Sequence, residues 1–288
     1  MKIKAKDIII LIESGSDFPL DLAKENNIEI VPMHVIIDQH DYCDGQLPIS
    51  KIIEYYDNTH RIPSTSAANV SDYLNAYRKI HKQYPDKCIL HLCYSAVTTA
   101  TWQNSIIASE DLDYVYHIDT KFVSGGQTLV VYKIMNYIKE NPLSSLDDVI
   151  NYTQNVIKNT HMYFIPRQLD FLKAGGRVSN AQYLGANILK LKPVIELVEG
   201  KLVCTKKYRN NNYQKACLKM IKESFEKYTP NFNDIFLVST YGLENETKKD
   251  ITNILKELGF KNIHWIHAQG VITTHGGPNG FGMAFCEI

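Results

Sequence analysis

Short apolar runs alternate with helix-like stretches through the first half of the chain, and this alternation limits the fold more than any other feature of the sequence. The strand-like runs are Ile8–Ile12, Ile28–Ile37, Cys88–Tyr94 and Tyr114–Asp119, and the helix-like stretches that follow them are Leu20–Asn26, Ile49–Asp57, Thr98–Ser109 and Gln127–Glu140. This order is typical of βαβ units, whose right-handed crossovers lay the strands parallel with helices on both faces. We therefore expect a mainly parallel sheet, with ligands bound beyond the carboxyl ends of its strands.

The pattern changes near Asn159, where we place a domain boundary. Just before it, Ser144 or Ser145 is expected to cap a helix whose first turn is acidic. The elements expected after the boundary are strands at Met162–Pro166, Ile235–Ser239, Ile263–His267 and Met283–Ile288, a hairpin at Pro193–Thr205, and helices at Leu169–Ala174, Tyr213–Tyr228 and Glu244–Leu258. We predict an α/β protein with two domains, a mainly parallel N-terminal domain at 1–160 and a mixed α/β domain at 161–288.

The charge balance narrows the classes of partner. Lys and Arg together number 31, as do Asp and Glu, so the chain has no net field to attract a polyanion. Nucleic acid and anionic membranes are therefore poor default partners. The first apolar run is too short to span a membrane and is followed by no signal-peptide cleavage site. Six cysteines without a C-x-x-C pair indicate reduced thiols, and we expect a cytoplasmic protein.

Four polar segments are candidates for a binding site. They are Glu13–Asp17, Ser64–Ser66, Ser95–Thr99 and Asp119–Lys121. Each could simply cap the next helix, which is the commonest use of such residues. Several hydroxyls and amides that converge on one sheet edge would instead form a donor cluster suited to a carboxylate or phosphate. Pro63 precedes three consecutive hydroxyls without an acid among them, so this segment is the best candidate for holding one anionic group.

Two further segments carry glycines beside a functional side chain. Thr274–Gly282 is interpreted as a glycine-rich loop between strands, but it lacks the Gly-Lys-Ser/Thr ending of a nucleotide-binding loop. His275 within it could bind a ligand or simply pack its imidazole. Gly175-Gly176 is typical of a helix stop, and Arg177 after it is a natural group for contacting an anion or a partner.

The sequence offers little for metal or hydrolytic chemistry. The histidines are scattered, and His264 and His267 alternate with apolar residues in one expected strand. We therefore expect no metal site. Ser95, Asp119 and His275 could be arranged as a serine-hydrolase triad, but the G-x-S-x-G elbow is missing.

Taken in order, several segments resemble the DegV family of bacterial fatty-acid-binding proteins, which includes the acyl-carrying subunits of fatty acid kinase. The strongest matches are Leu169–Ser179, Leu189–Val194 with Gly200 and Lys201, and His275–Pro278. Pro63–Ser66 resembles the Pro-x-Thr-Ser segment of the family. The Ser-Ser-Gly-Leu-Ser-Gly segment is looser, because an ungapped match leaves Ser95 as its only retained serine. The likeness runs over nearly the whole chain.

The resemblance implies a DegV-like fold of two α/β domains that buries a long-chain fatty acid such as palmitate or oleate. It implies no cofactor and no catalytic residue in this chain, because a separate fatty acid kinase catalytic subunit would phosphorylate the bound carboxylate. The residues that it places at the carboxylate are Thr65, Ser66, Ser95 and His275, with Gly276 and Gly277 in the nearby loop, and the partner-facing positions are Arg177 and Arg209. This expectation is consistent with the hydrophobic effect, because each buried methylene contributes about 0.8 kcal/mol to the binding free energy. The polar end of the ligand then serves mainly to orient it.

Two alternatives stay open at this point. One is a serine hydrolase that acts on acyl or lipid esters through Ser95 and His275. The other is a sensor of small anions that uses the same hydroxyls without an apolar tunnel.

Overall fold

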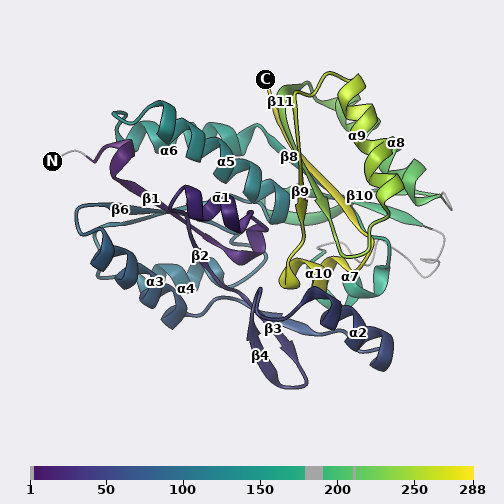
Figure 1. The fold of residues 1–288 in the computed structure, drawn as a ribbon, viewed down its shortest axis with the longest axis horizontal. Helices are drawn as coiled ribbons and strands as arrows, with labels where there is room; N and C mark the ends of the chain where they lie inside the picture. The colour runs from purple at the N-terminus through teal and green to yellow at the C-terminus, as the bar shows by residue number, and fades with distance from the viewer. Residues whose placement is uncertain (1–2, 179–190, 210–211) are drawn as a thin grey trace.

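Three sheets and their covering helices make up the fold of the computed structural model, which describes residues 3–178, 191–209 and 212–288 (Figure 1). Ser179, Leu189 and Lys190 of the family-like segments lie outside the described residues. The N-terminal strands are β1 (Ile8–Glu13), β2 (Glu29–Val31), β3 (His34–Ile37), β4 (His40–Cys43), β5 (Ser64–Ser66), β6 (Cys88–Cys93) and β7 (Val115–Asp119). The helices among them are α1 (Leu20–Glu25), α2 (Ile49–Thr59), α3 (Val70–Gln83), α4 (Thr101–Ala108), α5 (Ser124–Glu140) and α6 (Leu146–Lys158).

The remaining elements form the C-terminal part. Its strands are β8 (Thr160–Ile165), β9 (Lys192–Val198), β10 (Lys201–Tyr208), β11 (Pro230–Ser239), β12 (Asn262–His267) and β13 (Phe281–Glu287). Its helices are α7 (Leu169–Gly175), α8 (Tyr213–Lys227), α9 (Asn245–Glu257) and α10 (Gly270–Gly276). β8 begins beside the boundary that we placed at 160/161. The division into two domains stays a prediction.

The N-terminal sheet is parallel, with strand order β2-β1-β6-β7, as the alternating pattern predicts. Every residue of β1 and β6 is buried, because helices cover both faces of the sheet. Figure 1 shows α5 and α6 on one side of this sheet and α3 and α4 on the other. Ile10 packs into the core on the α5 side, whereas Ile9 and Leu11 pack on the α3 side.

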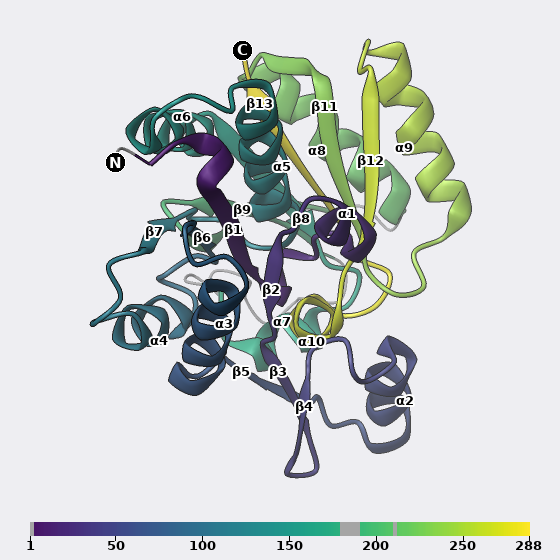
Figure 2. The ribbon, with the colours of Figure 1, turned by 60° about the vertical axis from the view of Figure 1, so that its left-hand side comes forward.

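The second large sheet has six strands in the order β10-β9-β8-β13-β11-β12. All of its neighbouring strands are antiparallel except β11 and β12, so the expected mixed α/β character is confirmed. Helix α5 lies between the two large sheets, and its residues Val130 and Ile134 share one core cluster with Leu90 of β6 and Val238 of β11. Figure 2 shows the same elements after a turn of 60° about the vertical axis.

A small antiparallel sheet, β4-β3-β5, lies beside α2 and α10 and differs from the sequence prediction. The run Ile28–Ile37 is split into β2 and β3, because Pro32 has no N–H for a ladder. Ser64–Ser66, which was not among the strands expected from the sequence, forms an edge strand paired with β3. The sequence analysis also missed α10, so His275 lies in the last turn of a helix and not in a loop between strands.

Candidate functional site

A narrow cavity lies between the carboxyl end of β6 and the six-stranded sheet. Its volume is about 920 Å³, which includes space that is open to solvent. Its apolar wall comes from both halves of the chain and consists of Met33, Val123, Met162, Phe164, Leu172, Leu197, Leu202, Val238, Val271 and Ile272. Its polar lining is mainly hydroxyl groups, those of Thr65, Ser66, Tyr94, Thr98, Thr99, Ser124 and Thr240, with the side chains of His275 and Arg177. Such a channel suits a thin apolar chain with a polar end.

Thr65 and His275 form the polar pair at the centre of this lining. Thr65 is the middle residue of β5 and pairs with Val35 of β3, which fixes its direction. The distance between Thr65 Oγ1 and His275 Nε2 is 2.7 Å, a hydrogen bond between residues 210 positions apart in the chain. The small sheet and α10 therefore bring together two residues that the sequence analysis placed at one ligand group.

Helix α7 shapes the other side of the His275 ring. His275 Nδ1 is buried and has no hydrogen-bond partner among the described residues. A Cβ atom at Gly175 would overlap this nitrogen, so the glycine leaves the room that the imidazole occupies. Gly176 then ends α7 with a φ of 61°, a conformation that glycine adopts without strain. The two glycines before Arg177 thus have separate structural roles.

The His275 ring is electrically neutral at neutral pH. Burial and, to a smaller extent, the nearby Arg177 guanidinium together lower its pKa from 6.5 to about 4. A neutral imidazole carries one N–H donor and one acceptor. The site therefore offers hydrogen-bond donors to an acid, and His275 adds no buried positive charge.

Two carboxylates fix the start of α10. One is the buried Asp17 of the candidate segment Glu13–Asp17, and the other is the half-buried Asp44, which was not singled out from the sequence. Asp17 Oδ1 accepts the backbone N–H of Gln269 at 2.7 Å, and Asp44 Oδ1 accepts that of Val271 at 3.2 Å. Ser14 Oγ donates to Asp44 Oδ2 at 2.9 Å. Burial raises the pKa of both carboxyl groups. These contacts join the turn after β1 to α10 and so help to position His275.

The other predicted site residues have different surroundings. Ser66, Gly276 and Arg177 line the cavity, whereas Gly277 follows α10 and is not among the lining residues. Arg177 is exposed, and its Nη1 donates to the carbonyl of Gly175 at 3.0 Å. Arg209 is also exposed, just beyond β10.

Ser95 is fully buried and engaged elsewhere. Its hydroxyl donates to the carbonyl of Gly200 at 2.7 Å, which joins the turn after β6 to the β9–β10 hairpin. Asp119 Oδ1 accepts the backbone N–H groups of Ala96 and Lys121. The hydrogen-bond chain of a Ser95–His275–Asp119 triad is therefore not formed, since each of the three has another partner.

Thr98 and Thr99 line the cavity from the same turn as Ser95, and both belong to the candidate segment Ser95–Thr99. The available signal was their position directly after a buried strand. An ungapped match to a serine-rich segment drew attention to Ser95 instead, whose side chain faces the hairpin.

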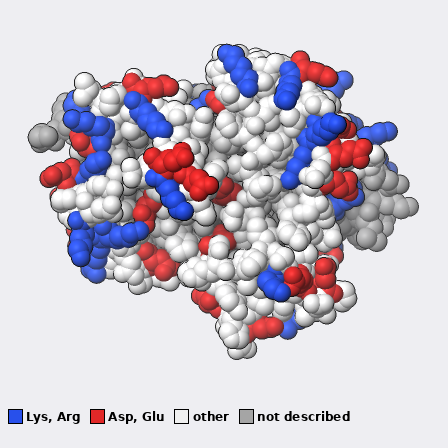
Figure 3. All heavy atoms as spheres, viewed as in Figure 1, with Lys and Arg blue, Asp and Glu red and all other residues white. Residues whose placement is uncertain are grey.

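The surface and the helices add two observations. Figure 3 shows Lys and Arg interspersed with Asp and Glu on the face drawn, so no single sign of charge dominates there. Within residues 3–178, 191–209 and 212–288, no helix combines the length and apolar character needed to cross a bilayer.

Comparison with known proteins places this geometry in a family. The sequence model described as "Uncharacterised protein, DegV family" matches residues 7–287. A fatty acid-binding protein of Thermotoga maritima is 25% identical over 296 residues, which cover 100% of this chain and 99% of the relative. Protein DegV of Bacillus subtilis is 23% identical over 287 residues, which cover 97% of this chain and 99% of that protein.

Solved structures share the fold along the whole chain. The structure of a fatty-acid-binding DegV family protein from Thermus thermophilus has a TM-score of 0.87 at 23% identity and covers 100% of both chains. A stearic acid-binding protein from Eubacterium ventriosum has a TM-score of 0.82 at 19% identity and covers 96% of this chain and 97% of its own. At these identities the likeness establishes the fold.

Proposed function

The chain belongs to the DegV family, and on that premise we propose that it binds a long-chain fatty acid in the cavity between its two large sheets. The observation that carries this proposal is the narrow apolar channel that reaches the Thr65–His275 pair. Relatives named as fatty-acid-binding proteins support it, as does a structural neighbour described with stearic acid.

The hydrocarbon tail supplies most of the binding free energy. Burying one methylene contributes about 0.8 kcal/mol, so the tail of a palmitate-sized acid contributes roughly 10 kcal/mol before the costs of ordering. The lining residues Met162, Leu197 and Val238 offer the apolar surface for this burial. The polar end of the ligand then decides which way the acid lies.

Thr65 donates to the carboxylate in our account. His275 Nε2–H donates to Thr65 Oγ1, which leaves the hydroxyl proton of Thr65 free for the ligand. This tautomer leaves the buried Nδ1 as an acceptor without a partner, which costs less than a buried N–H without one. His275 thus acts through Thr65, and Ser66 and Thr99 contribute further hydroxyls to the same lining.

We also propose that the bound acid is presented to a separate kinase catalytic subunit, so that this chain is a carrier and not an enzyme. In that step a carboxylate oxygen attacks the γ-phosphorus of ATP, the bond to the β,γ-bridging oxygen breaks, and ADP leaves with the electron pair. The product is an acyl phosphate. Because neutral hydroxyls leave a carboxylate oxygen free, the Thr65 contact is compatible with this attack. A step that uses ATP belongs in the cytoplasm, which we propose as the location.

Arg177 and Arg209 are our candidates for contact with the kinase or with the transferred phosphate. Both are exposed, and Arg177 also lines the cavity. A guanidinium pairs with a phosphate in a bidentate geometry through two parallel N–H donors.

Denaturing mass spectrometry of the purified full chain tests the lipid proposal. We expect about one long-chain fatty acid per chain, either co-purified or bound after addition of oleate or palmitate. A protein that neither carries nor takes up these acids would refute the proposal.

The kinase proposal is tested separately, with a fatty acid kinase catalytic subunit, ATP and the lipid-loaded protein. The acyl phosphate is trapped with hydroxylamine as a hydroxamate. We expect Arg209→Ala to retain the lipid and to lose hydroxamate formation. The control is Arg78→Ala, which changes an exposed arginine of α3 and is expected to retain both. Full hydroxamate formation by both Arg177→Ala and Arg209→Ala would exclude these arginines from the transfer step.

A further inference from the structure

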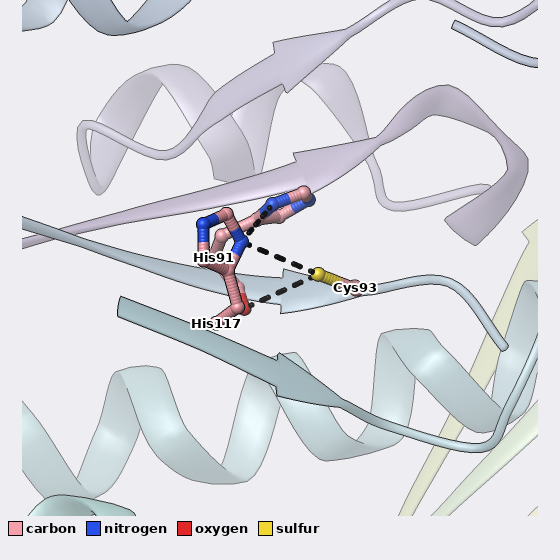
Figure 4. Close-up of side chains that lie close together, drawn as sticks. All are labelled: His91, Cys93 and His117. Carbon is pink, nitrogen blue, oxygen red and sulfur yellow. Dashed lines mark hydrogen bonds between the residues drawn. The ribbon is translucent and has the colours of Figure 1, made fainter. Parts of the chain in front are cut away.

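Two histidines and a cysteine converge on one face of the parallel sheet, away from the fatty-acid cavity. His91 and Cys93 are two residues apart in β6, so they point to the same face. His117 of β7 is the register partner of His91 and lies on that face as well. Figure 4 shows these three side chains, which we call the His-Cys-His cluster, turned toward one another. The sequence analysis missed the cluster because it joins strands that are separated by a helix.

The spacing of the three ligand atoms matches that of a metal site. His91 Nδ1 lies 3.2 Å from His117 Nδ1, and Cys93 Sγ lies 4.0 Å from His117 Nδ1. All three atoms lie within 4.8 Å of one another. In a tetrahedral zinc site, with Zn–N bonds of about 2.0–2.1 Å and a Zn–S bond of about 2.3 Å, two nitrogens are about 3.3 Å apart and a nitrogen and sulfur about 3.6 Å apart. The two imidazole nitrogens already have this spacing, and a movement of the Cys93 side chain toward them would let one ion contact all three.

The outer nitrogen of each imidazole is held by an oxygen. His91 Nε2 lies 2.9 Å from Glu13 Oε1, and His117 Nε2 lies 2.8 Å from Ser109 Oγ. Metal-binding histidines are commonly oriented in this way, by a carboxylate or another oxygen on the nitrogen that does not bind the metal. Both rings thus turn Nδ1 toward the centre of the cluster.

The burial of the His-Cys-His cluster and the charges around it favour binding of a divalent cation. His91, Cys93 and Glu13 are fully buried. A thiolate at Cys93 and the carboxylate of Glu13 would together balance the charge of a divalent ion, so its burial would leave no net charge. The rings of Tyr77 and Trp102 pack against the His117 ring. β7 is the edge strand of the sheet and His117 is only half-buried, which gives an ion a route to the site.

We propose that the His-Cys-His cluster binds one zinc ion through His91 Nδ1, Cys93 Sγ and His117 Nδ1. Thiolate and imidazole are ligands that zinc prefers, whereas calcium and magnesium require oxygen. Cys93 binds as the thiolate, and its proton is released to solvent. The Tyr77 hydroxyl, 3.3 Å from His91 Nδ1, or a water molecule completes the coordination. The bound ion would link β6 to the edge strand β7. We expect zinc to bind whether or not the cavity holds a fatty acid.

The test measures zinc in the full-length protein. Protein purified from zinc-supplemented cells is analysed by mass spectrometry for metals, and metal-free protein is titrated with zinc against a chelator. Cobalt is used as a spectroscopic substitute. We expect one zinc ion per chain, and with cobalt a thiolate charge-transfer band and the absorption of a tetrahedral ion. A folded protein that binds no zinc, or that binds copper(I) but not zinc, would overturn the proposal.

Matched variants assign the ligands. Cys93→Ala is expected to abolish the charge-transfer band, whereas Cys88→Ala, in the same strand but in the core on the opposite face, is expected to keep it. Should Cys93→Ala fail to fold, Ser109→Ala replaces it, because this partly buried hydroxyl at the end of α4 contacts His117 without being a ligand of the ion. Its other contacts are the backbone carbonyls of Ser105 and Ile106. We expect Ser109→Ala to weaken zinc binding about 10–100-fold. Unchanged zinc affinity in Ser109→Ala, or equal zinc loss in Cys88→Ala and Cys93→Ala, would contradict the assignment.

Discussion

Replacing Thr65 with valine tests the head-group account, because valine keeps the shape of the side chain and removes only the hydroxyl. In the wild-type protein Thr65 Oγ1 lies 2.7 Å from His275 Nε2 and, in our proposal, donates its own proton to the fatty-acid carboxylate. A hydrogen bond to a charged group contributes about 1.5–3 kcal/mol. Its loss converts to an affinity about 10–100-fold lower.

The affinity is measured by displacement of a fluorescent fatty acid from delipidated protein, with palmitate as the competitor. Ser64→Ala is the matched control, since Ser64 is the adjacent residue of β5 but is exposed and does not line the cavity. Thr65→Ser, which keeps a hydroxyl, should retain most of the affinity. Circular dichroism and thermal unfolding confirm that each variant is folded.

Two results would refute the reasoning. If Thr65→Val binds palmitate as tightly as the wild-type protein, Thr65 does not contact the carboxylate. If Ser64→Ala loses as much affinity as Thr65→Val, the effect comes from the strand and not from the hydroxyl at position 65.

Three further predictions follow from the same site. Shortening the ligand from sixteen to twelve carbons removes four buried methylenes, or about 3 kcal/mol, so laurate should bind up to about two orders of magnitude more weakly than palmitate in a titration; equal affinities would argue for a small-anion site. Gly175→Ala should displace the His275 ring, because a Cβ atom at position 175 would overlap Nδ1 of His275. The variant should have a free energy of unfolding lower by about 1–3 kcal/mol in denaturant titrations and should bind palmitate more weakly. A variant with wild-type stability and affinity would show that the His275 ring can move without cost. The lowered pKa of His275, from 6.5 to about 4, means that between these values the unfolded chain binds a proton that the folded chain does not. The His275 contribution to stability is therefore present above pH 6.5 and is lost as the pH falls toward 4, by about 3 kcal/mol, and His275→Gln should remove that part of the pH slope; an unchanged slope would show that His275 does not cause it.

The sequence was enough to predict the parallel sheet, because β1 and β6 are continuous apolar runs that stay buried on both faces. It was less informative for short elements. β5 consists of three hydroxyl residues, which as a pattern are typical of a loop and become a strand only through pairing with β3. α10 is a single stretch of seven residues rich in glycine and threonine, and its start is fixed by Asp17, which lies 252 residues away in the sequence.

The candidate site shows the same division. Thr65 and His275 could be identified as candidates from their local sequence, and the structure places these two side chains in contact. The direction of the Ser95 side chain could not be predicted from local sequence, because its hydroxyl donates to the carbonyl of Gly200, 105 residues further along the chain. His91, Cys93 and His117 form a cluster only once β6 and β7 are paired in register, so a search for local metal-ligand spacing does not find it.

A crystal structure of the full chain soaked with palmitate would show the ligand and its contacts directly. We expect one acyl chain along Met162, Leu197 and Val238, with a carboxylate oxygen within hydrogen-bond distance of Thr65 Oγ1. A cavity that stays filled with ordered water after soaking, or an acid bound with its carboxylate at the apolar end, would contradict this expectation.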